Sequence, residues 1–245
     1  MENKSFSLNE YQNILNAYKG RFVKFDEVKK ETFVILRHDV EYSVKRALTI
    51  AELESKNNVS STFFFKVRSN VYNPFSRINI EKINKIKKMG HDIGLHFYVT
   101  HLKNKNINEL RSELNQQKNI FEQGLNIECK SFSFHRPPLW VLEIREDYID
   151  GLINAYGPSY FEFSKTPQKI KYISDSQHKW NFGHPLDFIN LQKLQLLFHP
   201  DEWSKKGDNN YEEFFNDLIK ENNDEFLLYL ENETKHFENY KKKLK

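Results

Sequence analysis

The sequence predicts an α/β protein whose parallel sheet carries its functional groups at one edge. Residues 33–36 form a short apolar run, which is typical of a strand covered by helices on both faces. Segments with strand character alternate with segments that have helical spacing, and this order implies parallel strands joined by right-handed crossovers. In addition, five of the expected strands run directly into ionisable side chains, mostly histidines and aspartates.

Length and composition favour a single folded domain over residues 1–245. A chain of 245 residues can bury a sizeable core, and we find no internal repeat, low-complexity segment or linker that would divide it. Lys+Arg number 37 against 34 Asp+Glu, which gives a formal charge of +3. This excess is too small and too evenly spread to predict nucleic-acid binding, although a local patch could still bind an anionic substrate.

Cysteine usage and hydropathy predict the compartment. Cys129 is the only cysteine of the sequence, which excludes an internal disulfide framework and is typical of a reducing environment. The first residues lack a basic region followed by an apolar core, and no run approaches the ~20 apolar residues of a membrane span. We therefore expect a cytoplasmic protein without a membrane span.

The first half of the chain is expected to alternate helices and strands. Ser7 can cap a helix that reaches about Tyr18, and Glu10 lies where a capping box needs it. Ser43 can cap a second helix, which extends to residues 57–58. The remaining expected elements here are strands at residues 33–39, 62–67 and 91–96 and a helix at residues 79–89, which Gly90 ends.

The second half is less regular. A helix is expected at residues 108–121, and strands are expected at residues 131–134, 172–176 and 194–198. Between residues 139 and 182 the pattern is otherwise weak. From Tyr211 onward the chain is predicted to be helical, with a break at residues 222–224, Asn-Asn-Asp, that splits this helix in two.

The expected strand ends bring together groups that can bind a metal or carry a proton. Because the carboxyl ends of parallel strands meet at one edge, these groups would line the mouth of a barrel. Imidazole and carboxylate together are typical ligands of zinc and other divalent first-row metals. Cys129 precedes its strand, and we predict neither a ligand nor a nucleophile role for it. The groups are His38, Asp39 and Glu41, then His96, His135 with Arg136, Asp175, and His199.

These segments, in this order, resemble the polysaccharide deacetylase superfamily, which comprises the NodB-homology domain and family four-like carbohydrate esterases. The resemblance covers residues 33–203, and Gly90-His-Asp-Ile-Gly-Leu-His96 is its most specific match. It implies a deformed (β/α) barrel, here with helical extensions at both ends, and a metal-dependent hydrolase of an N-acyl, mainly N-acetyl, group on an amino sugar. The other matching segments are Leu36-Arg-His-Asp-Val-Glu41, Ser61-Thr-Phe-Phe-Phe65, Phe134-His-Arg-Pro-Pro138 and Leu197-Phe-His199.

The resemblance also implies roles for individual residues. Glu41, His96 and His135 would hold the ion, with Zn²⁺ expected and Co²⁺ or another first-row metal as alternatives. Asp39 would be the general base, and His199 would protonate the departing amine. The two remaining catalytic candidates are Asp175, which could orient His199, and Arg136, which could orient Asp39 or bind an anionic group of the substrate.

The sequence departs from the family pattern in two places. Family members usually have adjacent aspartates, whereas Val40 separates Asp39 from Glu41. An alternative therefore makes Asp39 a ligand and His38 the base. The family also supplies a second histidine four residues after the first, but position 100 is a threonine, so His101 is a reserve ligand beside His135.

The departures leave more than one function open. The main hypothesis is a deacylase acting on a small amino-sugar substrate, such as a nucleotide-linked or lipid-linked precursor of a surface polysaccharide. A second hypothesis is a catalytically inactive protein that binds a carbohydrate or a partner. A third keeps the metal and changes the bond that is cleaved to another amide, a formamide or a phosphoester.

Overall fold

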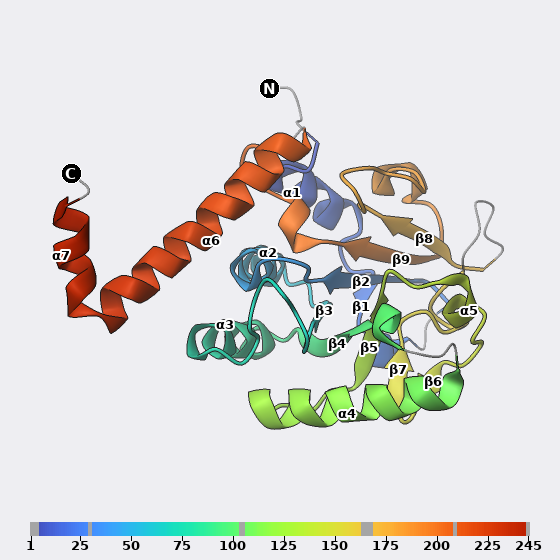
Figure 1. Ribbon diagram of the computed structural model, residues 1–245. Helices are drawn as coiled ribbons and strands as arrows, with labels where there is room; N and C mark the ends of the chain where they lie inside the picture. The colour runs from blue at the N-terminus through green and yellow to red at the C-terminus, as the bar shows by residue number, and fades with distance from the viewer. Residues whose placement is uncertain (1–4, 29–30, 103–105, 163–168, 208–209, 244–245) are drawn as a thin grey trace.

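A curled, mainly parallel sheet forms the centre of the molecule. The computed structural model describes residues 5–28, 31–102, 106–162, 169–207 and 210–243. Eight of the nine strands in the described residues follow the order β6-β7-β5-β4-β3-β2-β9-β8, and the ninth, β1, pairs with β2 beside this path. Every pair is parallel except β6 with β7. The sheet curls into a half-barrel with helices on its outside (Figure 1), which confirms the predicted α/β class and deformed barrel.

The strands and helices have the following bounds. The strands are β1 (Phe22–Val23), β2 (Phe33–Asp39), β3 (Thr62–Phe65), β4 (Asp92–Tyr98), β5 (Ser131–His135), β6 (Tyr148–Ile149), β7 (Leu152–Asn154), β8 (Lys171–Ser174) and β9 (Lys193–Phe198). The helices are α1 (Leu8–Ala17), α2 (Val44–Lys56), α3 (Arg77–Lys88), α4 (Ile107–Leu125), α5 (Leu139–Leu142), α6 (Tyr211–Glu233) and α7 (Lys235–Lys243). None of the described helices has the length and apolar composition that a membrane crossing requires.

Serine caps begin three of the helices. Ser7 Oγ accepts a hydrogen bond from the backbone N–H of Glu10 at the start of α1, and Ser43 does the same for Arg46 at the start of α2. Ser76 caps α3, which therefore begins two residues before the predicted start. Such a cap satisfies backbone donors that have no partner within the helix. Gly90 follows α3 with a φ of 96°, a conformation that a glycine adopts without steric cost.

The elements missed by the sequence analysis are short. β1 and β6 have two residues each and β7 has three, which is too few for a hydrophobic period to show. β6 and β7 lie in the region where the pattern was weak. The predicted strand at residues 172–176 is β8, which ends at Ser174, so that Asp175 follows it directly.

The predicted break in the C-terminal helix is wrong. α6 runs without interruption from Tyr211 to Glu233, and the chain turns only at Thr234 before α7. Ion pairs hold α6 on both sides of the Asn-Asn-Asp segment: Glu221 pairs with Arg46 of α2 and Glu225 pairs with Lys82 of α3. These tertiary contacts outweigh the modest helix propensity of asparagine and aspartate.

Side chains connect the two sides of the half-barrel where no backbone ladder joins them. In the described part of the chain, β6 and β8 are the two ends of the hydrogen-bonded order. Gln195 of β9 spans the gap by donating from Nε2 to the carbonyl oxygens of Ala155 and Tyr160, both at 2.9 Å. Aromatic rings fill the rest, with Tyr156 4.9 Å from Phe161. The interior of the half-barrel below the mouth is therefore filled by buried side chains.

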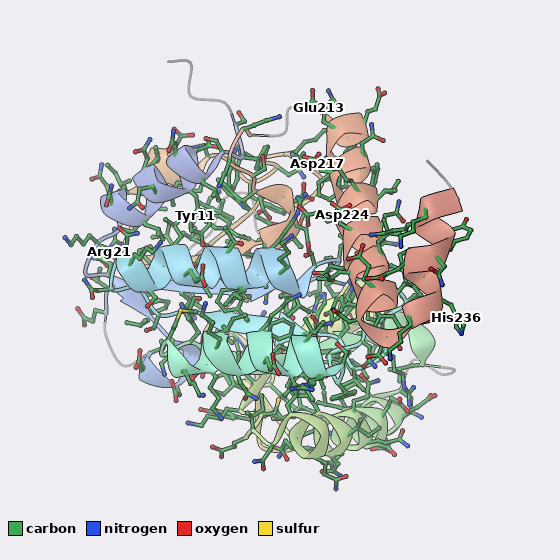
Figure 2. All side chains as sticks on the ribbon, turned by 90° about the vertical axis from the view of Figure 1, so that its left-hand side faces the viewer. Tyr11, Arg21, Glu213, Asp217, Asp224 and His236 are labelled. Atoms are coloured by element: carbon green, nitrogen blue, oxygen red, sulfur yellow. The ribbon has the colours of Figure 1, made fainter. Side chains whose placement is uncertain are left out.

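The helices α1 to α4 cover the outer face of the sheet, and Figure 2 shows α2 and α3 side by side in this layer. A buried polar cluster lies beneath them. Glu54 of α2 contacts His38 Nε2 at 2.8 Å and accepts hydrogen bonds from the hydroxyls of Tyr11 and Ser61. His38 is fully buried there. Alternate residues of a strand point to opposite faces, so His38 faces away from the side that carries Arg37 and Asp39.

Candidate metal centre

Three side chains from separate segments meet at the carboxyl edge of the sheet. Glu41 lies two residues beyond β2, His96 lies within β4, and His135 is the last residue of β5. Glu41 Oε1 is 2.9 Å from His96 Nε2 and 2.9 Å from His135 Nδ1, and the two nitrogens are 3.2 Å apart. The structure thus brings the three predicted ligands together, as a group able to hold a metal ion.

A hydrogen-bond chain sets the orientation of His96. Ser133 Oγ donates to Asp39 Oδ1 at 2.9 Å, so it accepts the hydrogen of His96 Nδ1 at 2.7 Å. With Nδ1 engaged in this bond, Nε2 is the nitrogen that faces Glu41 and His135. Metal-binding histidines are commonly fixed by such an outer hydrogen bond.

Gly94 allows β4 to pack closely against its neighbours. A Cβ atom at this position would lie 2.5 Å from the Phe64 ring and 2.8 Å from the Ser131 carbonyl oxygen. Such contacts cannot be relieved without moving β3 or β5. The glycine two residues before His96 therefore maintains the strand packing that places this histidine beside Ser133.

The donor set fits a divalent cation. Burial lowers the pKa of His135, although Glu41 acts in the opposite direction. Burial alone would raise the pKa of Glu41, but the two histidines and the Lys66 ammonium hold it well below its ordinary range. Two ligands about 2.0–2.1 Å from a tetrahedral zinc ion are about 3.3 Å apart, close to the spacing here. A carboxylate and two imidazoles could thus hold such an ion with positions left open.

Lys66 is a site residue that the sequence analysis missed. It follows β3, is only 3% exposed, and forms an ion pair with Glu41 Oε2. Its ammonium also lies 5.1 Å from the centre of the Tyr98 ring. Because Lys66 occupies one carboxylate oxygen of Glu41, the other oxygen, Oε1, is the one directed at the histidines.

Asp39 lies beside the three candidate ligands and is almost fully buried. Its Oδ2 is 3.6 Å from Arg37 Nη2 and 3.8 Å from His96 Nδ1. Burial alone would raise the pKa of Asp39, but Arg37 and the nearby imidazoles lower it below its usual value. Asp39 faces the non-coordinating nitrogen of His96, and this position favours Glu41 as the ligand.

The expected contact between Arg136 and Asp39 is not the one that the structure shows. Arg136 is exposed at the rim of the cavity, with a φ of 47°, whereas Arg37 is the arginine beside Asp39. Arg37 is fully buried and donates from Nη2 to the hydroxyl of Tyr156 at 2.8 Å. Its signal in the sequence was its position two residues before Asp39, on the same face of the strand.

His199 and Asp175 lie together just after the neighbouring strands β9 and β8, as the sequence analysis expected. His199 Nδ1 is 2.6 Å from Asp175 Oδ1, and the same carboxylate accepts hydrogen bonds from the backbone N–H of His199 and from Trp203 Nε1. Burial alone would lower the pKa of His199, but the Asp175 carboxylate outweighs it and raises the pKa to about 10. At neutral pH this histidine is a cation.

The His199–Asp175 pair gives a pH prediction for the metal-free protein. The imidazole should remain protonated at neutral pH and titrate near pH 10, and Asp175→Asn should lower its pKa by about 1–3 units. Because the folded pKa exceeds the ordinary 6.5, the pair stabilises the fold fully below about pH 6.5, and this contribution is lost as the pH rises through about 10. NMR titration of the ring measures both values. A wild-type ring that titrates near its ordinary pKa would contradict this prediction.

Two reserve assignments have different outcomes. His38, the alternative base, is buried on the outer face of the sheet against Glu54 and is not among the residues that line the cavity. The alternative that makes it the base is therefore wrong. His101, the reserve ligand, follows β4, but its side chain lies outside the described part of the structure.

The candidate ligands open into a cavity of about 600 Å³. Asp39, His199 and Arg136 also line it. Aromatic residues make up much of its wall, and three of them come from the start of α6, which no local pattern connected with the site. The aromatic lining residues are Tyr42, Phe134, Tyr156, Phe161, Tyr172, Phe182, Tyr211, Phe214 and Phe215.

Neither a protein-family model nor a curated protein sequence matches the chain. Among solved structures, it is similar to a CE4 family pseudoenzyme from Bacillus anthracis, with 17% identity and a TM-score of 0.46 over 80% of this chain and 62% of that chain. A family 4 carbohydrate esterase from Bacillus anthracis matches with 16% identity and a TM-score of 0.43 over 88% and 86%. A family 4 carbohydrate esterase from Streptomyces lividans in complex with acetate matches with 15% identity and a TM-score of 0.42 over 69% and 79%. This chain thus spans less than two thirds of the pseudoenzyme.

Proposed function

We propose that the protein is a metal-dependent hydrolase that removes an N-acyl group, mainly N-acetyl, from an amino sugar. The observation that carries this proposal is the convergence of Glu41, His96 and His135 beside a buried, ionised Asp39. An ionised carboxylate next to a metal-binding triad is the arrangement that metal-assisted hydrolysis needs. The cationic His199, which lines the same cavity, adds a proton donor.

The proposed mechanism divides the work between these residues. Glu41, His96 and His135 would hold a divalent ion, which would supply Lewis-acid chemistry for the amide carbonyl and for water. Asp39 takes the proton of the attacking water, and its carboxylate is held in place by Arg37 and Ser133.

His199 completes the reaction on the leaving-group side. Its protonated ring donates to the amine nitrogen as the carbon–nitrogen bond breaks, because an amine leaves more readily than an amide anion. Asp175 keeps the ring cationic and fixes its orientation through Nδ1. Because Nδ1 is bonded to Asp175, Nε2 is the ring nitrogen that donates the proton to the substrate.

The cavity supports a small substrate. Its volume of about 600 Å³ lies within the about 300–1,000 Å³ of small-molecule sites. The aromatic wall offers apolar surface for a sugar ring and an acyl group. Arg136 at the rim is placed for an anionic group, and this supports a phosphate-bearing substrate such as a nucleotide-linked or lipid-linked amino sugar.

A metal-reconstitution assay tests the proposed function. Protein loaded with Zn²⁺ or Co²⁺ should release free amine and carboxylic acid from N-acyl amino sugars, and the chelated protein should lose this activity until metal is returned. The panel includes neutral and phosphate-linked N-acetyl sugars, formamides and phosphoesters. If only formamides and phosphoesters are cleaved, the protein is a hydrolase of another bond and the proposed removal of an N-acyl group is wrong. Metal-loaded protein that cleaves none of them would support the carbohydrate- or partner-binding alternative.

A further inference from the structure

We infer that the C-terminal helix α6 is part of the active site, because a chain of contacts through Glu221, Arg46 and Asp201 holds the loop that carries Glu41. The inference rests on the proposed function, in which Glu41 binds the metal ion. It makes Asp201, Arg46 and Glu221 positioning residues, although none of them contacts the expected position of the ion.

The first link holds the backbone of the ligand loop. Asp201 lies in the 3₁₀ turn Pro200–Glu202, which His199 separates from the end of β9, and is 1% exposed. Its Oδ2 accepts hydrogen bonds from the backbone N–H groups of Glu41 and Tyr42, both at 3.0 Å. These two residues lie between the end of β2 and the start of α2. One carboxylate oxygen therefore fixes the segment from which the Glu41 side chain extends.

The second link connects this turn to α2. Arg46 lies in the first turn of α2, is 7% exposed, and donates from Nη1 to the carbonyl oxygen of Asp201 at 2.6 Å. The guanidinium is also 5.9 Å from the centre of the Phe214 ring on α6. A cation buried to this extent needs an anionic partner to offset the loss of hydration.

The third link comes from α6. Glu221 accepts a two-pronged set of bonds from Arg46, with Nε to Oε2 at 3.1 Å and Nη2 to Oε1 at 3.1 Å. Such paired bonds between arginine and a carboxylate fix direction as well as charge. Figure 2 shows α6 standing beside α2 and α3. Through Arg46, α6 therefore helps to fix the position of Asp201, and Asp201 in turn fixes the loop that carries Glu41.

The first turns of α6 also form a wall of the cavity. Tyr211, Phe214 and Phe215 line it, and the Phe214 ring is 6.1 Å from the ring of Tyr42, the residue after Glu41. Figure 1 shows the rest of α6 leaving the barrel diagonally. The helix thus contacts the ligand loop at its first turns and anchors it again at Glu221.

Paired alanine substitutions on α6 test the inference in the full-length protein. Glu221→Ala removes the partner of Arg46, and Glu225→Ala is the matched control, since Glu225 lies one turn later and pairs with Lys82 of α3 at 3.0 Å. Zn²⁺ affinity is measured by competition with a chelator. The temperature is kept well below the melting temperature of each variant, so that every protein is folded. We expect Glu221→Ala to weaken Zn²⁺ affinity about tenfold, in the range for outer residues that orient a ligand, and Glu225→Ala to change it less than about twofold.

Asp201 provides a second variant pair, which separates positioning from general destabilisation. Asp201→Ala removes the acceptor of both N–H groups and should weaken Zn²⁺ binding by about 10–100-fold. Asp201→Asn keeps an oxygen that can accept them and should recover most of that loss. If Glu221→Ala and Glu225→Ala bind Zn²⁺ equally well, or if Asp201→Asn is as weak as Asp201→Ala, the inference is wrong while the proposed function stands. If the wild-type protein does not bind Zn²⁺, the proposed function itself is wrong.

Discussion

Replacing His96 with alanine is expected to abolish specific Zn²⁺ binding and hydrolysis together. His96 Nε2 is one of three converging donor atoms, and its orientation is already set by Ser133. Losing a direct ligand should therefore cost more than the about 100-fold that outer residues contribute to metal affinity. Isothermal titration calorimetry with Zn²⁺ measures the loss, and circular dichroism checks that the fold is retained.

His236 supplies the control for this experiment. It lies on α7, is exposed, and is not among the described residues that line the cavity. His236→Ala should leave Zn²⁺ affinity unchanged, because it removes an imidazole that could bind the ion only non-specifically. If His96→Ala and His236→Ala have the same affinity as the wild type, the three side chains do not form the metal site.

Replacing Asp39 with asparagine is expected to lower kcat by about 10²–10⁴-fold, the usual contribution of a general base, while Zn²⁺ affinity is retained. Asparagine has nearly the same shape and can still accept the hydrogen bond from Ser133. It cannot take a proton from water at neutral pH. Steady-state kinetics with the metal-loaded variant, together with a Zn²⁺ titration, separates the two effects.

Asp92 is the matched control for Asp39. It is the first residue of β4, at the other end of the barrel, and pairs with Lys24 at 3.2 Å. Asp92→Asn makes the same substitution outside the cavity and should leave kcat within about twofold of the wild type. If Asp39→Asn loses the ion but retains kcat at saturating metal, Asp39 is a ligand and the assignment of the base is wrong.

The sequence predicted the inner strands and the side chains at their ends for a common physical reason. A strand covered on both faces is mainly apolar, as residues 33–36 are, and the ionisable Arg37, His38 and Asp39 occupy the last positions of β2, next to the site. Parallel pairing then brings the ends of β4 and β5 together. These two facts suffice to predict that His96 and His135 are neighbours.

The residues that support the site could not be predicted in this way. Asp201 and Glu41 are 160 positions apart, and Lys66 appeared only as one polar residue in a strand-like segment. Their roles depend on which loops meet at the barrel mouth, which local hydrophobic periods do not encode. The continuity of α6 could not be predicted for the same reason, because it depends on ion pairs with Arg46 of α2 and Lys82 of α3.

Anomalous diffraction from crystals grown with Zn²⁺ tests the central claim most directly. The account predicts a strong peak at the carboxyl edge of the sheet, about 2.0–2.2 Å from Glu41 Oε1, His96 Nε2 and His135 Nδ1. It also predicts that Asp39 Oδ atoms lie outside the coordination sphere. A zinc peak at another site, or no peak between these three side chains at saturating Zn²⁺, would contradict the account.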